Sequence, residues 1–274
     1  MRVFLGIDGG GSTCRARVVD RHGTVIGSGQ SGPANITTDR EGSLTAILAA
    51  ARVALGDLPF GVVTAALGLA GANDRQAAAD LAQRLPFART RIVTDGHIAV
   101  KGALADTDGI VAALGTGSVF VVQRHGEQRE IGGKGLILGD EASGAWIGRK
   151  LLSAALRADD GFQPMTPLLV RVLVDIGGVA AVIGFAKTAT PADFAALAPL
   201  VAGSNDPAAL AILQESTGEV LRAIALLQGT DRLPVVCLGG LAPVYAPRIG
   251  AVWQLAQPLG TGLDGALSLA RSIR

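Results

Sequence analysis

Aromatic residues and cysteines are scarce in this chain. The shortage of cysteine excludes a disulfide framework and a cysteine-ligated metal cluster. Of the 274 residues, 4% are aromatic, and Cys14 and Cys237 are the only cysteines. Both lie in segments predicted to be apolar strands, so one chain has neither a disulfide framework nor the thiolates for a metal cluster. Hydrophobic residues still make up 49% of the sequence. We therefore expect a folded globule in a reducing, cytoplasmic compartment.

The chain also lacks an excess of charges of one sign, a long apolar run and a histidine cluster. Its formal net charge is +1 and its lysines and arginines are not clustered, so we expect no nucleic-acid partner. No uncharged run reaches the roughly 18 residues that a membrane-spanning helix needs. The three histidines, His22, His97 and His125, are too scattered to suggest a metal site or a catalytic triad. We expect a soluble protein without a membrane partner.

The order of the predicted elements indicates two α/β lobes of related design. Three strands open the first lobe, and helices then alternate with strands, which implies parallel pairing. At Gly109 the strand pattern restarts, and a largely helical stretch follows it. The predicted strands are 2–8, 13–20, 24–28, 61–67, 91–94, 110–114, 118–124, 128–132 and 233–238. The predicted helices are 39–55, 74–85, 96–104, 140–175 with a break at 161–167, 191–202 and 207–227. We expect lobes at 1–107 and 108–259, with a last helix at 260–274 that packs back on the first lobe.

Each lobe opens with a glycine-rich turn that could bind phosphate. Glycines 9–11 follow the first strand, and Gly115-Thr116-Gly117 repeats the arrangement in the second lobe. Main-chain N–H groups in such turns can point into one concavity, and small residues let an anion approach closely. Asp8 suits a role beside Mg²⁺, held through water, because a carboxylate repels phosphate. An ordinary hairpin turn is the alternative for either turn alone, but the recurrence favours phosphate binding.

Two common nucleotide-binding motifs are excluded. The segment 27–32 has the GxGxxG spacing of dinucleotide-binding proteins, but Pro33-Ala34-Asn35 follows it instead of an amphipathic helix. The GxxxxGK[ST] pattern of a P-loop does not occur. Backbone dipoles and Mg²⁺ would therefore have to meet the charge of a phosphate.

Polar residues after predicted strands are the candidates for chemistry. Asp95 directly follows the strand 91–94, where it could orient a hydroxyl and accept its proton, although it could also cap the helix that starts at Gly96. Asp140 and Glu141 follow a glycine-rich segment and could accept hydrogen bonds from sugar hydroxyls, although Asp140 could equally be a helix cap. Asn35 lies in a loop where it could contact the same ligand, although Asn is also a common turn residue.

Six ordered motifs, at residues 4–13, 67–71, 94–95, 114–118, 139–144 and 258–270, together resemble one family. They are similar to the amino-sugar kinases grouped with BadF/BadG-type ATPases, which belong to the sugar kinase, heat-shock protein and actin superfamily. The resemblance covers essentially the whole chain and is strongest to bacterial glucosamine kinases. It implies an α/β fold of two ribonuclease-H-like lobes, the actin-like ATPase fold, with a nucleotide cleft between them.

The resemblance also implies an activity and a role for each motif. The expected activity is ATP-dependent phosphorylation of the 6-hydroxyl of an amino sugar, with glucosamine favoured and ATP and Mg²⁺ as cofactors. Asp95 would be the catalytic base, and Asp8 would organise the Mg²⁺. The residues expected to bind the nucleotide are Asp8, Gly10, Gly11, Ser12, Thr13, Gly115, Thr116, Gly117, Gly239 and Gly240. The residues expected to bind the sugar are Asn35, Asp95, Gly132, Gly133, Asp140 and Ser143.

Three alternatives to a glucosamine kinase stay open. One is a nucleotide-binding regulator without chemistry, which would need Asp95 to point away from the cleft. Glu141 in the Gly-Asp-Glu-Ala-Ser loop looks more like N-acetylglucosamine kinases. An ATP-driven activator of a partner protein is the alternative from another class, but the cysteine pairs that hold an iron-sulfur cluster in that branch are absent. We also expect a homodimer formed through the C-terminal lobe.

Overall fold

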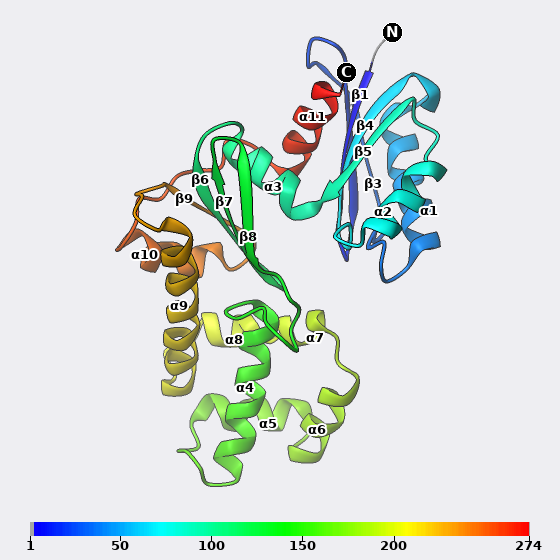
Figure 1. The fold of residues 1–274 in the computed structure, drawn as a ribbon. Helices are drawn as coiled ribbons and strands as arrows, with labels where there is room; N and C mark the ends of the chain where they lie inside the picture. The colour runs from blue at the N-terminus through cyan, green and yellow to red at the C-terminus, as the bar shows by residue number, and fades with distance from the viewer. Residues whose placement is uncertain (1–2, 274) are drawn as a thin grey trace. The chain divides into compact units, whose positions relative to one another are not determined.

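The structure, a computed structural model, describes residues 3–273 and divides into two compact units (Figure 1). Unit 1 contains the chain up to Thr107 together with the segment from Pro258 onward, and unit 2 is Asp108–Gln257. The expected first lobe and first strand begin at residues 1 and 2, and the expected last helix ends at residue 274. These three residues lie outside the described part of the chain.

Unit 1 is built on a five-stranded sheet of order β3-β2-β1-β4-β5. Its strands are β1 (Val3–Gly9), β2 (Cys14–Val19), β3 (Val25–Ser31), β4 (Val63–Leu69) and β5 (Arg89–Thr94). The first three strands pair antiparallel, whereas β1, β4 and β5 are parallel, which confirms the predicted parallel pairing. The carboxyl ends of these three parallel strands therefore lie at one edge of the sheet.

Helices cover both faces of the unit 1 sheet, as Figure 1 shows. They are α1 (Arg40–Leu55), α2 (Arg75–Arg84), α3 (Asp95–Leu104) and α11 (Gly262–Ser272), with a short 3₁₀ helix at Phe60–Val62. Alternate residues of β1 point to opposite faces. Leu5 and Ile7 therefore pack in the core shared with α1 and α2, whereas Phe4 packs with Ile98 of α3 and Leu267 of α11.

The GxGxxG spacing at 27–32 has a packing explanation. Most of this segment belongs to β3, and the next helix, α1, begins only at Arg40. A Cβ on Gly27 or Gly29 would lie 2.2 Å from the carbonyl oxygen of Ala54 or Ala50. These glycines let α1 approach the strand closely, so they have a role in packing.

Unit 2 combines a four-stranded sheet with most of the helices of the chain. The sheet has the order β8-β7-β6-β9, with β6 and β9 parallel and the other neighbours antiparallel. Its strands are β6 (Gly109–Leu114), β7 (Ser118–Arg124), β8 (Glu127–Gly132) and β9 (Val235–Leu238). The helices are α4 (Gly144–Asp159), α5 (Pro167–Ile176), α6 (Val179–Thr188), α7 (Pro191–Ala195), α8 (Ala198–Ala202), α9 (Pro207–Gln228) and α10 (Ala242–Gly250).

The helical part of unit 2 differs from the sequence-based expectation in three places. The predicted helix 191–202 is divided into α7 and α8, and Pro199 stands in the first turn of α8, where its missing N–H is tolerated. Helix α6 was not predicted, and it begins after two glycines. Helix α10 was also not predicted, and Pro247 lies inside it. Within residues 3–273, no single helix is long and apolar enough to cross a membrane; only two bent helix pairs reach that length jointly.

Glycines at the contact between α3 and α11 generate a stability prediction. A Cβ on Gly265 would lie 2.0 Å from the carbonyl oxygen of Ile98. The Gly265→Ala variant should therefore lower the free energy of unfolding by about 1–3 kcal/mol, because backbone has to move to make room. Urea denaturation measures this change. In the control Gly184→Ala, where no such atom lies within 4 Å, alanine should raise stability by about 0.5–1 kcal/mol. Equal effects at both positions would contradict the close-packing argument.

Candidate active site

The turn between β1 and β2 presents unused main-chain donors. The Gly10 N–H donates to the Thr13 carbonyl at 2.9 Å, and the Gly10 carbonyl accepts from the Ala34 N–H at 2.8 Å. Within residues 3–273, the N–H groups of Gly11 and Ser12 have no protein acceptor. A Cβ on Gly11 would also meet no atom within 4 Å. Free donors beside open space fit the phosphate groups that the sequence predicted here.

Asp8 forms an ion pair that sequence reasoning missed. Asp8 is opposite Arg15 in the β1–β2 ladder, and the Arg15 Nη2 group donates to Asp8 Oδ2 at 2.7 Å. The Asp8 side chain is 19% exposed, and the Arg15 side chain is 54% exposed. The pairing follows from the register of the hairpin, which the sequence alone does not give. Arg15 partly offsets the negative charge at the end of β1.

The acidic residues at this edge fit a loosely held Mg²⁺ better than a closed metal site. No group of three or more His, Cys, Asp or Glu side chains within the described residues could hold a metal ion. Asp8 and Asp95 are near enough for their charges to interact. Mg²⁺ commonly keeps several waters and uses one or two carboxylates together with substrate phosphates. The placement of Asp8 fits that kind of site.

Asp95 is the first residue of α3 and directly follows β5. The helix cap is Thr94, whose hydroxyl accepts from the His97 N–H at 3.1 Å, so the interpretation of Asp95 as the cap is wrong. Asp95 Oδ1 instead accepts from the Gly96 N–H at 2.9 Å. Crowding by protein atoms raises the pKa of Asp95, the hydrogen bond from Gly96 opposes that rise, and the charge of Asp8 adds to it. A raised pKa brings a carboxylate closer to the range in which a general base works best.

Asn35 lies at the same edge of the unit 1 sheet. Its backbone forms a bridge with Ala70, the residue after β4. Its Oδ1 atom accepts from the Thr37 N–H, the Thr37 hydroxyl and the Thr38 N–H, at 3.1, 2.8 and 3.3 Å. No protein acceptor for its Nδ2 group is found within the described residues. Asn35 thus braces its own loop and keeps an amide donor for a ligand.

The turn between β6 and β7 in unit 2, like the β1–β2 turn in unit 1, has main-chain N–H groups without a protein acceptor among the described residues. The carbonyls of Gly115 and Thr116 accept from the N–H groups of Gly144 and Ala145, at 2.8 and 3.1 Å, so the turn is attached to the first turn of α4. The N–H groups of Thr116 and Gly117 find no protein acceptor in the described part of the chain. A Cβ on Gly115 would meet no atom within 4 Å. This turn also fits an approaching anion.

Asp140 is buried directly beneath that turn. Its Oδ1 atom accepts from the Gly135 N–H at 3.1 Å, and its Oδ2 atom would lie 3.0 Å from a Cβ on Gly117. Burial raises the pKa of Asp140, the bond from Gly135 opposes the rise, and the charge of Glu141 adds to it. The cap of α4 is Ser143, whose hydroxyl accepts from the Trp146 N–H at 3.1 Å. The interpretation of Asp140 as a helix cap is therefore wrong.

The loop around Asp140 is held by side chains from other elements. The Ser118 hydroxyl donates to the Glu141 carbonyl at 2.7 Å, and the buried Tyr245 hydroxyl donates to the Ala142 carbonyl at 2.8 Å. Ser143, predicted to bind sugar, has no exposed surface, and its hydroxyl is used as the cap. Ser143 therefore supports the loop, and its contact with a sugar stays a prediction. Tyr245 was missed because it lies in α10, far along the chain from the loop.

Two glycine pairs flank the β6–β7 turn. Gly132 and Gly133, at the end of β8, have φ angles of 77° and 64°, and the Gly133 N–H donates to the Ser118 carbonyl at 2.9 Å. Gly239 and Gly240 follow β9, and a Cβ on Gly239 would lie 2.3 Å from the Leu114 carbonyl oxygen. Within each unit, the structure thus brings the predicted site residues together at one end of the sheet.

The two carboxylates of unit 1 allow a direct titration experiment. We expect the carboxyl carbon of Asp95 to titrate above the ordinary aspartate value of about 3.9, because surrounding atoms exclude water from it. In Asp8→Asn the pKa of Asp95 should fall, since a neighbouring negative charge is removed. Carbon-13 NMR of the labelled protein measures both values. Asp57→Asn, a charge change elsewhere in unit 1, should leave the pKa unchanged, and an identical pKa in Asp8→Asn would contradict the coupling.

Comparisons with known proteins connect these residues to a family. A profile of the BadF/BadG/BcrA/BcrD ATPase family matches residues 5–251. The Vibrio cholerae protein named glucosamine kinase GspK is 30% identical over 282 residues, which cover 98% of this chain and 96% of that protein.

Solved structures support the same assignment. A Chromobacterium violaceum protein assigned provisionally as an N-acetylglucosamine kinase has a TM-score of 0.91 and 34% identity, over 98% of this chain and 99% of that one. A ROK family glucokinase from Streptomyces griseus, crystallised with glucose and AMPPNP, has a TM-score of 0.62 at 19% identity, over 99% and 100%. This likeness confirms the predicted two-lobed, actin-like α/β fold. The family match confirms the resemblance of the motifs, and the chain belongs to the BadF/BadG/BcrA/BcrD ATPase family.

Proposed function

We propose that this protein is an ATP-dependent hexosamine kinase that phosphorylates the 6-hydroxyl of an amino sugar, with glucosamine favoured. The observation that carries the proposal is the placement of Asp95. Its carboxylate follows β5 at the carboxyl ends of the three parallel strands of unit 1. Its pKa is raised, and Asp8 and Asn35 lie at the same edge of the sheet. The whole-length similarity to a protein named glucosamine kinase supports the substrate class.

In the proposed reaction, Asp95 acts as the general base. Its carboxylate accepts the proton of the sugar hydroxyl while the hydroxyl oxygen attacks the γ-phosphorus and the bond to ADP breaks. The Gly96 N–H fixes Asp95 Oδ1 and so limits the rotation of the carboxylate. Arg15 keeps Asp8 paired, which reduces repulsion between Asp8 and the phosphates.

Main-chain donors are proposed to bind the phosphates. Each unit supplies one turn, with the N–H groups of Gly11 and Ser12 in unit 1 and of Thr116 and Gly117 in unit 2. Such donors stabilise anions without a lysine of the P-loop kind. When bound, Mg²⁺ would neutralise part of the phosphate charge, and Asp8 would hold it through water. The neighbouring Gly239 and Gly240 are proposed to contact the adenosine.

The proposed sugar contacts are Asn35 and Asp95 in unit 1 and Asp140 with the Gly132-Gly133 turn in unit 2. Asp140 and Glu141 place two carboxylates next to each other, and such a pair attracts the ammonium group of glucosamine. N-acetylglucosamine is the alternative substrate, because Glu141 resembles the N-acetylglucosamine kinases and the Chromobacterium violaceum protein is assigned to that activity. An ATPase that activates a partner protein is the alternative from another class.

One assay separates these possibilities. ADP release is followed by a coupled assay with glucosamine, N-acetylglucosamine or glucose, and phosphorylated sugar is identified by mass spectrometry. We expect glucosamine to stimulate ADP release most strongly and to gain one phosphoryl group. Stimulation by N-acetylglucosamine instead would identify that sugar as the substrate. ATP hydrolysis without a response to any sugar would favour an ATPase that activates a partner protein.

A cytoplasmic location and a homodimer formed through unit 2 complete the proposal. Both cysteines are free thiols in the structure. Burial raises the pKa of Cys14 and of Cys237 to about 11. Neither thiol is therefore poised to ionise and form disulfides, which suits a reducing compartment.

Replacing the proposed base tests the mechanism. Asp95→Asn keeps the size of the side chain but cannot accept the proton, so kcat should fall by about 10²-fold or more. The affinity for ATP, measured by titration calorimetry, should stay within the range of the parent protein. A kcat close to the parent value would remove Asp95 from the mechanism.

The open space at Gly115 gives a second test. In Gly115→Val the Cβ position has no protein atom of the described residues within 4 Å, so the fold should persist while the side chain next to the turn donors weakens ATP binding. Titration calorimetry with ATP measures the effect. Gly61→Val is the matched control, since Gly61 is exposed, has no atom within 4 Å of its Cβ position and lies outside the proposed site. Unchanged ATP affinity in Gly115→Val would argue against phosphate binding at this turn.

A further inference from the structure

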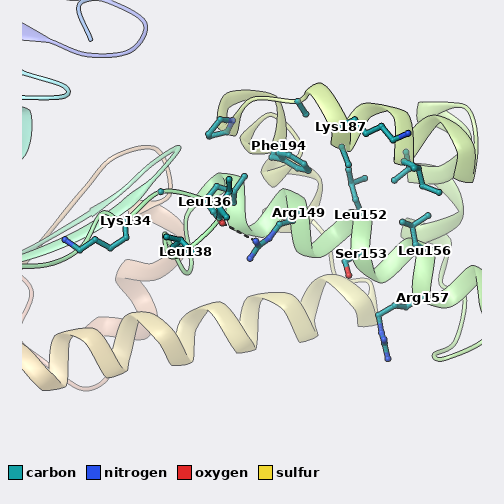
Figure 2. Close-up of a pocket in the computed structure, with 17 residues that line it drawn as sticks. Lys134, Leu136, Leu138, Arg149, Leu152, Ser153, Leu156, Arg157, Lys187 and Phe194 are labelled. Atoms are coloured by element: carbon teal, nitrogen blue, oxygen red, sulfur yellow. Dashed lines mark hydrogen bonds between the residues drawn. The ribbon is translucent and has the colours of Figure 1, made fainter. Parts of the chain in front are cut away.

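A large cavity in the helical part of unit 2 has no role in the proposed reaction. It has a volume of about 1120 Å³ and lies between the loop 134–138 and helices α4, α6 and α7 (Figure 2). Its wall is mainly apolar, with Leu152, Leu156, Val182 and Phe194 among the lining residues. This volume is enough for a drug-sized organic molecule.

Among the described residues that line the cavity none is acidic, and four are basic: Lys134, Arg149, Arg157 and Lys187. None of the four takes part in an ion pair within residues 3–273, although Asp and Glu pair with basic residues elsewhere in both units. Figure 2 shows Lys134 and Arg157 at opposite ends of the cavity, with Arg149 between them. The charge is therefore concentrated at the ends of the cavity, where it would attract an anionic group.

Helix electrostatics explain only part of this arrangement. Arg157 and Lys187 stand in the last turns of α4 and α6, where the helix dipole favours cations. Arg149 lies in the first half of α4 and Lys134 in a loop, so the dipole does not account for them. Two exposed apolar side chains, Ile137 and Leu138, stand at the rim and are 88% and 85% exposed.

The rim loop is fixed in position. Arg149 Nη1 donates to the Leu136 carbonyl at 3.1 Å, and the Gly139 N–H donates to the Gly135 carbonyl at 2.8 Å. The Gly135 N–H is bonded to Asp140. A cavity whose walls are held before a ligand arrives loses less entropy on binding.

We propose that this cavity is a binding site for a small amphipathic anion, a molecule with an apolar chain and a carboxylate or phosphate group. The apolar wall would cover the chain, and the cations at the cavity, which form no ion pair within the described residues although Arg157 stacks on Phe162, would bind the anionic group. A second copy of the protein fits less well, because a two-fold contact would bury this patch, with four basic residues and no acidic residue among its lining, against an identical patch. All residues that line the cavity belong to unit 2, and the inference does not depend on the proposed kinase activity.

Titration calorimetry of the full chain with decanoate and decyl phosphate tests the site without ATP or sugar. Both anions should bind, and the stronger of the two identifies the preferred head group. Decanol and decyltrimethylammonium should bind more weakly, because they lack the negative charge. Binding should raise the thermal unfolding temperature, whereas detergent-like action would lower it. Absence of binding by both anions, or equal binding by the cationic probe, would overturn the proposal.

Variants locate the binding. Removing two cations in Lys134→Gln/Lys187→Gln should weaken anion binding by about three- to tenfold, as expected for two exposed charge contacts. The control Lys150→Gln/Arg171→Gln removes two charges elsewhere in unit 2 and should have no effect. Ile183→Glu places a carboxylate on the cavity wall and should abolish binding. Equal binding by all variants would place the anion elsewhere, and self-association that Ile183→Glu prevents would assign the cavity to a second copy.

Discussion

The closeness of two carboxylates, those of Asp8 and Asp95, is the constraint on which the candidate site depends. Parallel pairing of β1, β4 and β5 places both groups at one edge of the sheet, where their charges interact. Arg15 offsets the charge of Asp8, while Asp95 keeps a raised pKa. In the proposed phosphoryl transfer, the ion-paired Asp8 would hold the metal, and Asp95, whose pKa is raised, would act as the base.

Unit 2 also places a carboxylate beside a glycine turn, but side chains from other elements hold the loop that carries it. Its glycine turn directs carbonyls toward the start of α4 and leaves two N–H groups for a ligand, with the Asp140 carboxylate buried beneath. Ser118 and Tyr245 hold the loop that carries Asp140. The loop continues into the rim of the cationic cavity through Gly135. The candidate sugar-binding carboxylate and the second candidate site therefore share one rigid segment.

Much of this arrangement could be predicted from the sequence because it depends on local patterns. Alternation of strands and helices predicted the parallel pairing, and the glycine turns and Asp95 were located by the ends of apolar strands. The missing helix after 27–32 excluded a dinucleotide-binding motif. Most element boundaries fall within two or three residues of the prediction. Helices α6 and α10 were missed, since glycine and proline mask their periodicity.

Contacts between distant segments were decided only by the tertiary structure. The pairing of Arg15 with Asp8 depends on hairpin register, and the bond from Tyr245 to Ala142 joins residues more than a hundred positions apart. Several neighbouring polar residues could have capped α3 and α4. The backbone geometry decided that Thr94 and Ser143 do so. The sequence by itself determined most of the strands and helices and the strand ends at which the glycine turns and Asp95 lie. Packing decided which side chains meet, because register and burial are properties of the assembled sheet and helices rather than of any single segment.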